Sequence, residues 1–333
     1  MTCSNPNFPA DLPSTTRLTP TLRAAALAGT ALMLGLATQP ADALPLLVQA
    51  PYRDVYVIGD SLSDNGNLLA LTHGAAPPAP YFQGRFSNGP VAVEVLATGL
   101  GAVLHDFAIG GAKTDTGGQL AGSGMTAQLA QYATLLNGSP ADSSALYVVW
   151  GGANDLRAAG VNAAAAIAPT IFNLTSIVSS LYGLGARHFL LPNLPDLGLT
   201  PEALDLGATF ASGASLASQA FNLNLGAAYG ALAAALPDEQ FTYFDAFAAQ
   251  TALVAGVGSN GFTDVSHRCF NARFGSLCAT PGTYLYWDSI HPTAAAHSLL
   301  GAQMLAAVPE PASMLLMSAG VLLLLGLGRS RRR

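Results

Sequence analysis

Short apolar runs that end in glycine and polar residues recur along the first half of the chain. Residues 55–58 lead into Gly59-Asp60-Ser61, residues 103–109 into Gly110-Gly111, and residues 145–150 into Gly151-Gly152-Ala153-Asn154. The runs are rich in β-branched and aromatic residues, which predicts buried strands. Two further strands are expected over residues 186–191 and 241–245.

Longer segments between these runs have the character of helices. They are expected over residues 162–181, 209–236 and 293–307. Another helix is predicted after Ser87 or Asn88, because either side chain can cap a helix that carries Pro90 in its first turn. Strands that alternate with helices indicate an α/β fold with a mainly parallel sheet.

Ligands of such sheets bind at the carboxyl ends of the strands. Ser61, Gly111 and Asn154 each follow a predicted strand, so we expect them at one edge of the sheet. A serine hydroxyl becomes a nucleophile when a base takes its proton. Asp288 stands three residues before His291, near enough to hold the imidazole in one tautomer, although a backbone carbonyl can do the same. The pattern predicts a catalytic Ser61–His291 pair oriented by Asp288.

The N-terminal residues have the pattern of a secretory signal peptide. Arg17 and Arg23 precede an apolar run over residues 24–37, and Ala41-Asp42-Ala43 is a small-x-small cleavage site. We expect cleavage after Ala43. A membrane anchor is disfavoured because the run is short for a bilayer span.

The C-terminal residues have a different pattern. Pro309-Glu310-Pro311 ends the last predicted helix, because two close prolines cannot continue it. An uncharged segment over residues 312–328 is just long enough to cross a bilayer, and it precedes Arg329, Arg331, Arg332 and Arg333. The chain therefore divides into a signal peptide (1–43), one domain (44–307) and a tail (308–333).

Averages over the 333 residues, 51% hydrophobic and 10% charged, are distorted by the two ends. Residues 44–307 alone carry 7 Lys or Arg and 16 Asp or Glu, a net charge of −9. An acidic domain without a basic run argues against nucleic-acid binding, which needs clustered Lys and Arg. The domain is long enough to bury a sizeable core.

Of the three cysteines, Cys3 belongs to the leader. Cys269 and Cys278 remain, and the exported compartment permits a disulfide between them. A zinc site would need more ligands than the one nearby histidine, His267, so we expect a disulfide and no metal.

The segments described above resemble the sequence blocks of the GDSL (SGNH) hydrolases. The strand-Gly-Asp-Ser segment and Asp288-x-x-His291 are similar to the first and last blocks. Residues 107–112 resemble the second block, with Asp106 where Asn is usual, and residues 151–155 the third. Gly84-Arg85-Phe86-Ser87-Asn88-Gly89-Pro90 is similar to the secreted lipase and phospholipase-like branch. The resemblance implies a flavodoxin-like three-layer sandwich around a five-stranded sheet.

The resemblance also implies an oxyanion hole made by the backbone N–H groups of Ser61 and Gly111 and by the Asn154 amide. Asp155 is interpreted as a cap for the helix that follows. The expected function is two-step hydrolysis of a carboxylic ester through an acyl-enzyme, without metal or cofactor. The alternatives are an O-acetyl esterase acting on exopolysaccharide and a non-catalytic biofilm-matrix surface protein; the complete set of reacting residues favours an enzyme.

Pro-Glu-Pro, an apolar helix and an arginine cluster resemble the PEP-CTERM sorting signal of exopolysaccharide-producing Gram-negative bacteria. The resemblance implies an exosortase-type partner, transient anchoring in the inner membrane, and removal of the tail. The mature protein would then reside at the cell surface or in the extracellular matrix. The alternative is a permanent single-pass anchor.

Overall fold

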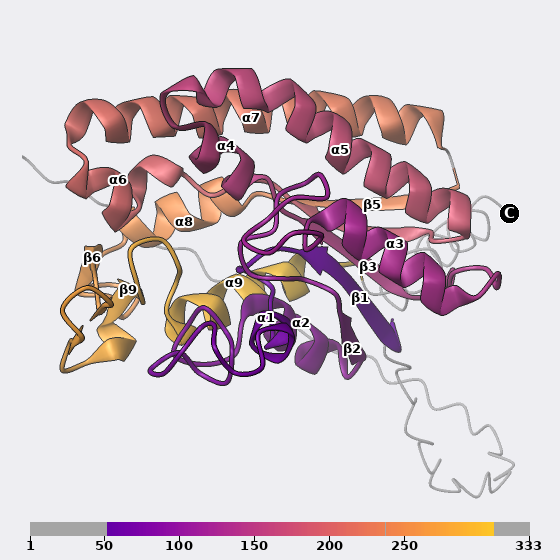
Figure 1. Cartoon of the computed structure of the whole chain (residues 1–333). Helices are drawn as coiled ribbons and strands as arrows, with labels where there is room; N and C mark the ends of the chain where they lie inside the picture. The colour runs from indigo at the N-terminus through magenta and orange to yellow at the C-terminus, as the bar shows by residue number, and fades with distance from the viewer. Residues whose placement is uncertain (1–51, 237, 310–333) are drawn as a thin grey trace, which may run out of the picture. The chain divides into compact units, whose positions relative to one another are not determined.

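A single parallel sheet organises the domain. The computed structural model describes residues 52–236 and 238–309. The strands of the sheet are β1 (Asp54–Gly59), β2 (Val103–Asp106), β3 (Leu146–Trp150), β4 (His188–Pro192) and β5 (Gln240–Phe244). They lie in the order β2-β1-β3-β4-β5, and every neighbouring pair is parallel (Figure 1). This is the flavodoxin-like order, so the predicted fold is confirmed.

Helices cover both faces of this sheet (Figure 1). They are α1 (Asn67–Leu71), α2 (Ala92–Leu100), α3 (Met125–Leu136), α4 (Ala153–Ala159), α5 (Ala163–Leu184), α6 (Pro201–Asp205), α7 (Ala208–Ala235), α8 (Ala246–Ala255) and α9 (Ala294–Ala307). Short 3₁₀ turns occur at η1 (Gly160–Asn162), η2 (Leu197–Leu199) and η3 (Pro281–Thr283). The three long helices predicted from the sequence are present within a few residues of the expected bounds, and the helix predicted after Ser87 or Asn88 is α2.

Successive side chains of each strand enter opposite layers, as the period of two requires. Tyr147 and Val149 of β3 pack with α3, α5 and α7, whereas Leu146 and Val148 pack with α2, α8 and α9. All five residues of β3 are buried, because helices cover both of its faces. The result is the expected three-layer sandwich.

The predicted cap of α2 is wrong. The helix begins after Val91, whose N–H donates to the Glu94 carboxylate at 2.9 Å. Ser87 instead donates to the carbonyl of Pro292, and the Asn88 side chain accepts the N–H of Ala294 at the start of α9. Both side chains therefore fasten this segment to the loop that carries His291.

By length and hydropathy, one helical stretch of the described residues, Ala153–Leu184, is long and apolar enough to cross a membrane. Its longest part is α5, which packs Leu174, Ile177 and Leu181 into the core beside the sheet. We interpret it as an outer helix of this domain. The apolar segments predicted at 24–37 and 312–328 lie outside the described residues.

Between α8 and α9 the chain forms small strands instead of a long helix. β6 (Asp264–Arg268) pairs with β9 (Tyr284–Tyr286), and β7 (Phe270–Asn271) pairs with β8 (Ser276–Leu277). The expected disulfide joins Cys269 to Cys278 across the second pair. This segment leads directly into the loop with Asp288 and His291.

Candidate active site

Ser61 lies in the turn that follows β1. The end of β1 is held by Gln128 of α3, whose amide accepts the N–H of Gly59 and donates to its carbonyl, both at 2.9 Å. The carbonyl of Asp60 accepts the N–H groups of Ser63 and Asp64, both at 3.0 Å, which closes the turn. The serine is thus presented on backbone that is fixed from both sides.

A buried carboxylate, Asp64, ties this turn to the loop after β2. It accepts the N–H groups of Gly66, Asn67 and Leu68 at the start of α1. It also accepts the N–H of Gly110 at 2.7 Å. Burial raises the pKa of Asp64, and these four donors oppose that rise. Asp64 therefore sets the position of the Gly110-Gly111 turn relative to Ser61.

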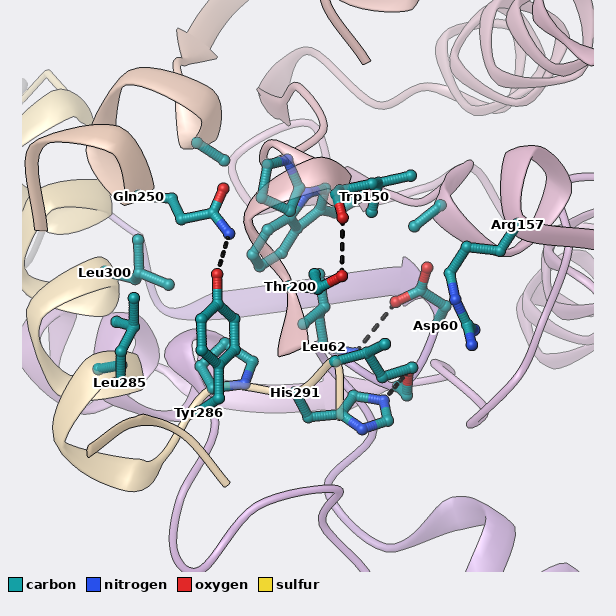
Figure 2. A pocket seen from close by; sticks show the side chains of 18 of the residues that line it. Asp60, Leu62, Trp150, Arg157, Thr200, Gln250, Leu285, Tyr286, His291 and Leu300 are labelled. Atoms are coloured by element: carbon teal, nitrogen blue, oxygen red, sulfur yellow. Dashed lines mark hydrogen bonds between the residues drawn. The ribbon is translucent and has the colours of Figure 1, made fainter. Parts of the chain in front are cut away.

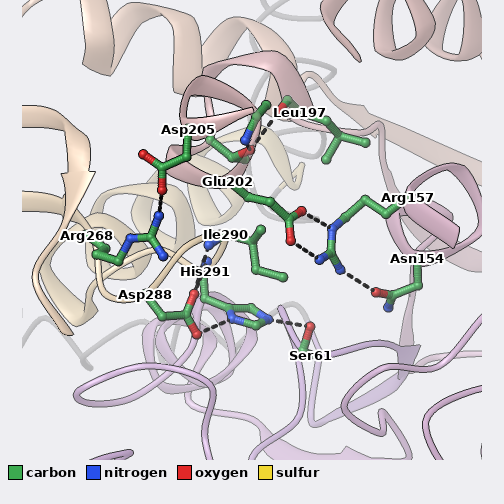
Figure 3. A network of polar contacts seen from close by, with 12 residues as sticks. Ser61, Asn154, Arg157, Leu197, Glu202, Asp205, Arg268, Asp288, Ile290 and His291 are labelled. Carbon is green, nitrogen blue, oxygen red and sulfur yellow. Dashed lines mark hydrogen bonds and ion pairs between the residues drawn. The ribbon is translucent and has the colours of Figure 1, made fainter. Parts of the chain in front are cut away.

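The structure brings Ser61, His291 and Asp288 into one hydrogen-bonded chain (Figure 3). Ser61 Oγ lies 2.8 Å from His291 Nε2, and His291 Nδ1 lies 2.7 Å from Asp288 Oδ2. All three residues are buried, each with 7% of its surface exposed. The three are separated in the sequence by up to 230 residues and meet at the carboxyl edge of the sheet.

The Asp288 carboxylate is fully hydrogen-bonded. Its Oδ1 accepts the N–H groups of Ile290 and His291, and its Oδ2 accepts His291 Nδ1 and the Tyr81 hydroxyl. Burial alone would raise the pKa of this carboxyl, but the His291 charge and these donors outweigh burial and lower the pKa to about 2. Asp288 is therefore ionised at neutral pH and acts as a fixed acceptor.

Tyr81 is a site residue that the sequence did not reveal. It donates to Asp288 at 2.6 Å and lies 207 residues away in the chain. Its ring contacts Phe270 and Trp287 edge-on, with centroids 5.6 and 6.4 Å away. These rings and the disulfide of Cys269 form one cluster. The disulfide segment thus supports the residue next to Asp288 and the hydroxyl that donates to it.

The three donors predicted for the oxyanion hole follow β1, β2 and β3 at the carboxyl edge of the sheet. Within the described residues, the N–H groups of Ser61 and Gly111 have no protein acceptor. Asn154, at the start of α4, donates one amide hydrogen to the carbonyl of Ala112 at 2.9 Å, which fixes it beside Gly111 and leaves its second hydrogen available. Gly111 has a φ of 75°, which favours glycine, and a Cβ there would lie 2.7 Å from Gln119.

An ion pair that sequence reasoning also missed lies next to Asn154. Arg157 binds Glu202 of α6 through two hydrogen bonds of 2.8 Å, and its Nη1 lies 3.4 Å from Asn154 Oδ1 (Figure 3). The backbone N–H of Glu202 donates to the carbonyl of Ser289, in the His291 loop. This pair therefore links α4 and α6 across the top of the site.

A narrow pocket of about 60 Å³ opens at Ser61 (Figure 2). It is lined mainly by apolar side chains, including Trp150, Leu197 and Ile290. Asp60 also lines it, and burial raises the pKa of this carboxyl to about 6 despite its Leu62 N–H donor. An apolar pocket with a few polar groups at one end can hold a small uncharged acyl group.

Asp155 and three further histidines take no part in this hydrogen-bonded chain. Asp155 does not cap α4 but lies within it, and its carboxylate accepts both the N–H and the hydroxyl of Thr114. His188 bonds Gln240 at the far end of the sheet. His267 is exposed and bonds Asp264. His297 is buried behind the site, where burial lowers its pKa to about 3. No metal-like cluster of His, Cys, Asp or Glu occurs within the described residues.

A parallel sheet with a Ser–His–Asp chain at its carboxyl edge is the arrangement of ester hydrolases of the α/β class. The chain belongs to the GDSL-like lipase/acylhydrolase family, whose sequence profile matches residues 55–304. Membership identifies it as a carboxylic ester hydrolase. Residues 307–333 match the PEP-CTERM protein-sorting motif, which indicates export and C-terminal sorting.

Individual relatives are distant. A GDSL esterase/lipase of Arabidopsis thaliana is 26% identical over 75% of this chain and 88% of its own length. The thermolabile hemolysin of Vibrio parahaemolyticus is 27% identical over 75% of this chain and 62% of its own. A phosphatidylcholine-sterol acyltransferase of Aeromonas hydrophila is 30% identical over 51% of each. A solved lipolytic G-D-S-L protein from Veillonella parvula has a TM-score of 0.45 and 12% identity, covering 76% of this chain and 96% of its own.

Proposed function

We propose that this protein is an exported serine esterase that forms an acyl-enzyme on Ser61. The observation that carries the proposal is the continuous chain of hydrogen bonds from Ser61 Oγ through His291 to Asp288. Ser61 and His291 line an apolar pocket. With Nδ1–H donating to Asp288, His291 Nε2 is free to take the proton of Ser61 as its oxygen attacks the ester carbonyl.

The negative charge that develops on the carbonyl oxygen is stabilised by the N–H groups of Ser61 and Gly111 and by the Asn154 amide. His291 then gives its proton to the leaving alcohol. Water, deprotonated by His291, attacks the acyl-enzyme and releases the acid. Asp288 stays ionised throughout, because its pKa of about 2 lies far below the working pH.

The test is Ser61→Ala assayed on p-nitrophenyl acetate together with labelling by a serine-directed fluorophosphonate. We expect a loss of about 10³-fold or more and no labelling, because no other group can form the acyl-enzyme. Ser63→Ala is the matched control, since Ser63 is buried two residues away and its hydroxyl has no hydrogen-bond partner in the described structure. Activity of Ser61→Ala within tenfold of the wild type would rule out the mechanism.

We further propose that the domain spans residues 44–307, preceded by a cleaved leader and followed by a tail that an exosortase-type enzyme removes. Arg329, Arg331, Arg332 and Arg333 would hold the exported precursor in the inner membrane until cleavage releases the domain to the cell surface or matrix. Intact-mass analysis of cell fractions tests this order. Full-length C-terminus found solely in the inner membrane would show that the tail is a permanent anchor.

A further inference from the structure

A second cavity opens beside the catalytic pocket. It is bordered by α4, α5, α6 and α7, and its volume is about 800 Å³, compared with about 60 Å³ for the pocket at Ser61. Arg157, Leu197 and Thr200 line both spaces. The larger space, which we call the α4–α7 groove, therefore begins where the catalytic pocket ends.

The lining of the α4–α7 groove is apolar. It includes alanines and the larger side chains Val161, Ile167, Leu206, Phe210 and Leu216. Val161 and Leu216 are 91% and 65% exposed, although they are aliphatic. The two charged groups of the lining, Arg157 and Glu202, bind one another and so present little net charge to a ligand.

The two long helices that border the groove also lack charge. Residues 158–186, which contain α5, and residues 206–236, which contain α7, include no Asp, Glu, Lys or Arg. About 25% of the residues of an average soluble domain are charged. An apolar ligand can enter this groove without removing a charged side chain from water, which would oppose binding.

We propose that the α4–α7 groove binds the acyl chain of the substrate, and that the substrates are esters of medium- and long-chain fatty acids. This inference rests on the proposed function. A chain longer than a few carbons exceeds the pocket at Ser61, and the groove is the adjoining space, because Arg157, Leu197 and Thr200 line both. The leaving alcohol must lie beside His291, which protonates it. Arg157, which lines both spaces, lies 3.4 Å from the amide oxygen of Asn154, the expected donor to the acyl carbonyl oxygen, so we assign the groove to the acyl portion.

Gly213 offers a way to fill the groove without disturbing the fold. It lies in α7, lines the groove, and a Cβ built on it meets no atom within 4 Å. Gly213→Phe should place a ring in the groove, and the loss of a helical glycine should not destabilise α7. Gly226→Phe is the matched control, because Gly226 lies in the same helix with equally open space and does not line the groove.

The experiment compares kcat/KM for p-nitrophenyl acetate, butyrate, octanoate and decanoate below their micellar concentrations. For the wild type, kcat/KM should rise with acyl length by up to about fourfold per methylene. Gly213→Phe should leave the acetate value within twofold and lower the octanoate and decanoate values at least tenfold. Gly226→Phe should follow the wild type. Leu216→Asp, an exposed change at the rim, should cause the same selective loss.

Unchanged octanoate hydrolysis in both groove variants would overturn the proposal. A parallel assay with n-octyl acetate, which carries its chain in the alcohol, tests the assignment to the acyl side. Selective loss on that ester instead of the octanoate would also overturn the proposal. Failure of the catalytic mechanism is distinguishable, because it would appear as wild-type acetate hydrolysis that does not depend on Ser61.

Discussion

The two sides of Ser61 are held together by different interactions. On one side, which we call the loop side, residues 262–293 and Tyr81 are fixed by hydrogen bonds, stacked aromatic rings and a disulfide. On the other, the helix side, α4 to α7 pack through apolar side chains and leave an open groove. An esterase must hold its catalytic base in a fixed position and must also accommodate acyl chains of different lengths. The loop side meets the first requirement and the helix side meets the second.

This difference predicts that substitutions on the two sides will have different effects on the kinetics. A change on the loop side should affect hydrolysis of every ester by a similar factor, because it displaces His291 or Asp288. A change on the helix side should alter the preference among esters and leave the acetate rate intact. Three further substitutions test this division, from the largest expected effect on kcat to the smallest, and a fourth test concerns the pH dependence of stability.

Asn154 belongs to the helix side by position, since it starts α4. We nevertheless expect Asn154→Ala to lower kcat by about a hundredfold or more for all chain lengths, with KM little changed, because one oxyanion donor is lost. Steady-state kinetics across the p-nitrophenyl series measure this. A rise in KM with constant kcat would make Asn154 a ground-state binding residue.

The Cys269–Cys278 disulfide is the covalent part of the loop side. Replacing both cysteines by serine should lower the free energy of unfolding by about 2–3 kcal/mol, mainly because the unfolded chain regains freedom. It should also lower kcat for acetate and octanoate equally, since the cluster supports Tyr81 and Trp287. Denaturant unfolding and kinetics measure both effects. Two free thiols in periplasm-derived wild-type protein, detected by mass spectrometry, would contradict the bridge.

Tyr81→Phe removes one of the donors to Asp288 while it keeps the ring. We expect kcat to fall about tenfold for every ester, because the carboxylate loses a charge-assisted hydrogen bond that fixes its orientation. The pKa of Asp288 should rise from about 2, since a donor to the ionised form is gone. Tyr284→Phe, in the same cluster, is the control. Equal kcat in the two variants would remove Tyr81 from the site.

The last test uses pH. Because burial lowers the pKa of His297 to about 3, the unfolded chain binds a proton between about pH 6.5 and 3 that the folded chain does not. His297 therefore makes stability fall with decreasing pH, by up to ~1.4 kcal/mol per unit in this window. In His297→Asn this slope should be absent.

Asp60 has the opposite effect on the free energy of unfolding between about pH 6 and 4. Its raised pKa of about 6 keeps a proton on the folded chain that the unfolded chain loses, so Asp60 makes stability rise as the pH falls. That contribution is common to both proteins and cancels in the difference. Denaturant unfolding at several pH values gives the two curves. Parallel curves would show that His297 titrates normally in the folded protein.

Sequence patterns over a few residues were enough to predict the site residues whose positions depend on neighbouring backbone and on strand order. Ser61 and Asn154 follow strands, and Asp288 and His291 are three residues apart, so neighbouring backbone and strand order place them. The five strands were predicted for the same reason, because each lies in a short run that is rich in β-branched, apolar or aromatic residues. The small strands within the disulfide segment were not predicted, because two-residue pairings have no periodicity to detect.

The parts that were missed depend on contacts between distant segments. Tyr81 meets Asp288 across 207 residues and Gln128 meets Gly59 across 69. The wrong prediction that Ser87 or Asn88 caps α2 has the same origin, because the Asn88 side chain accepts the N–H of Ala294, 206 residues away at the start of α9. The groove arises from the spacing of two alanine-rich helices, and their sequences specify that they are helices but not how far apart they lie.

Val308 lies within the matched sorting motif and within the tail predicted from the sequence, but it packs with the domain. Val308 is 4% exposed and packs in the same core cluster as Met304 and Tyr52, close to the domain's other end. A cut beyond Pro309 leaves every core residue of the described part of the chain in place, whereas a cut a few residues earlier would remove Val308 and shorten α9. Folding thus protects the chain up to this point, and the domain itself defines how close to its own C-terminus a protease can act.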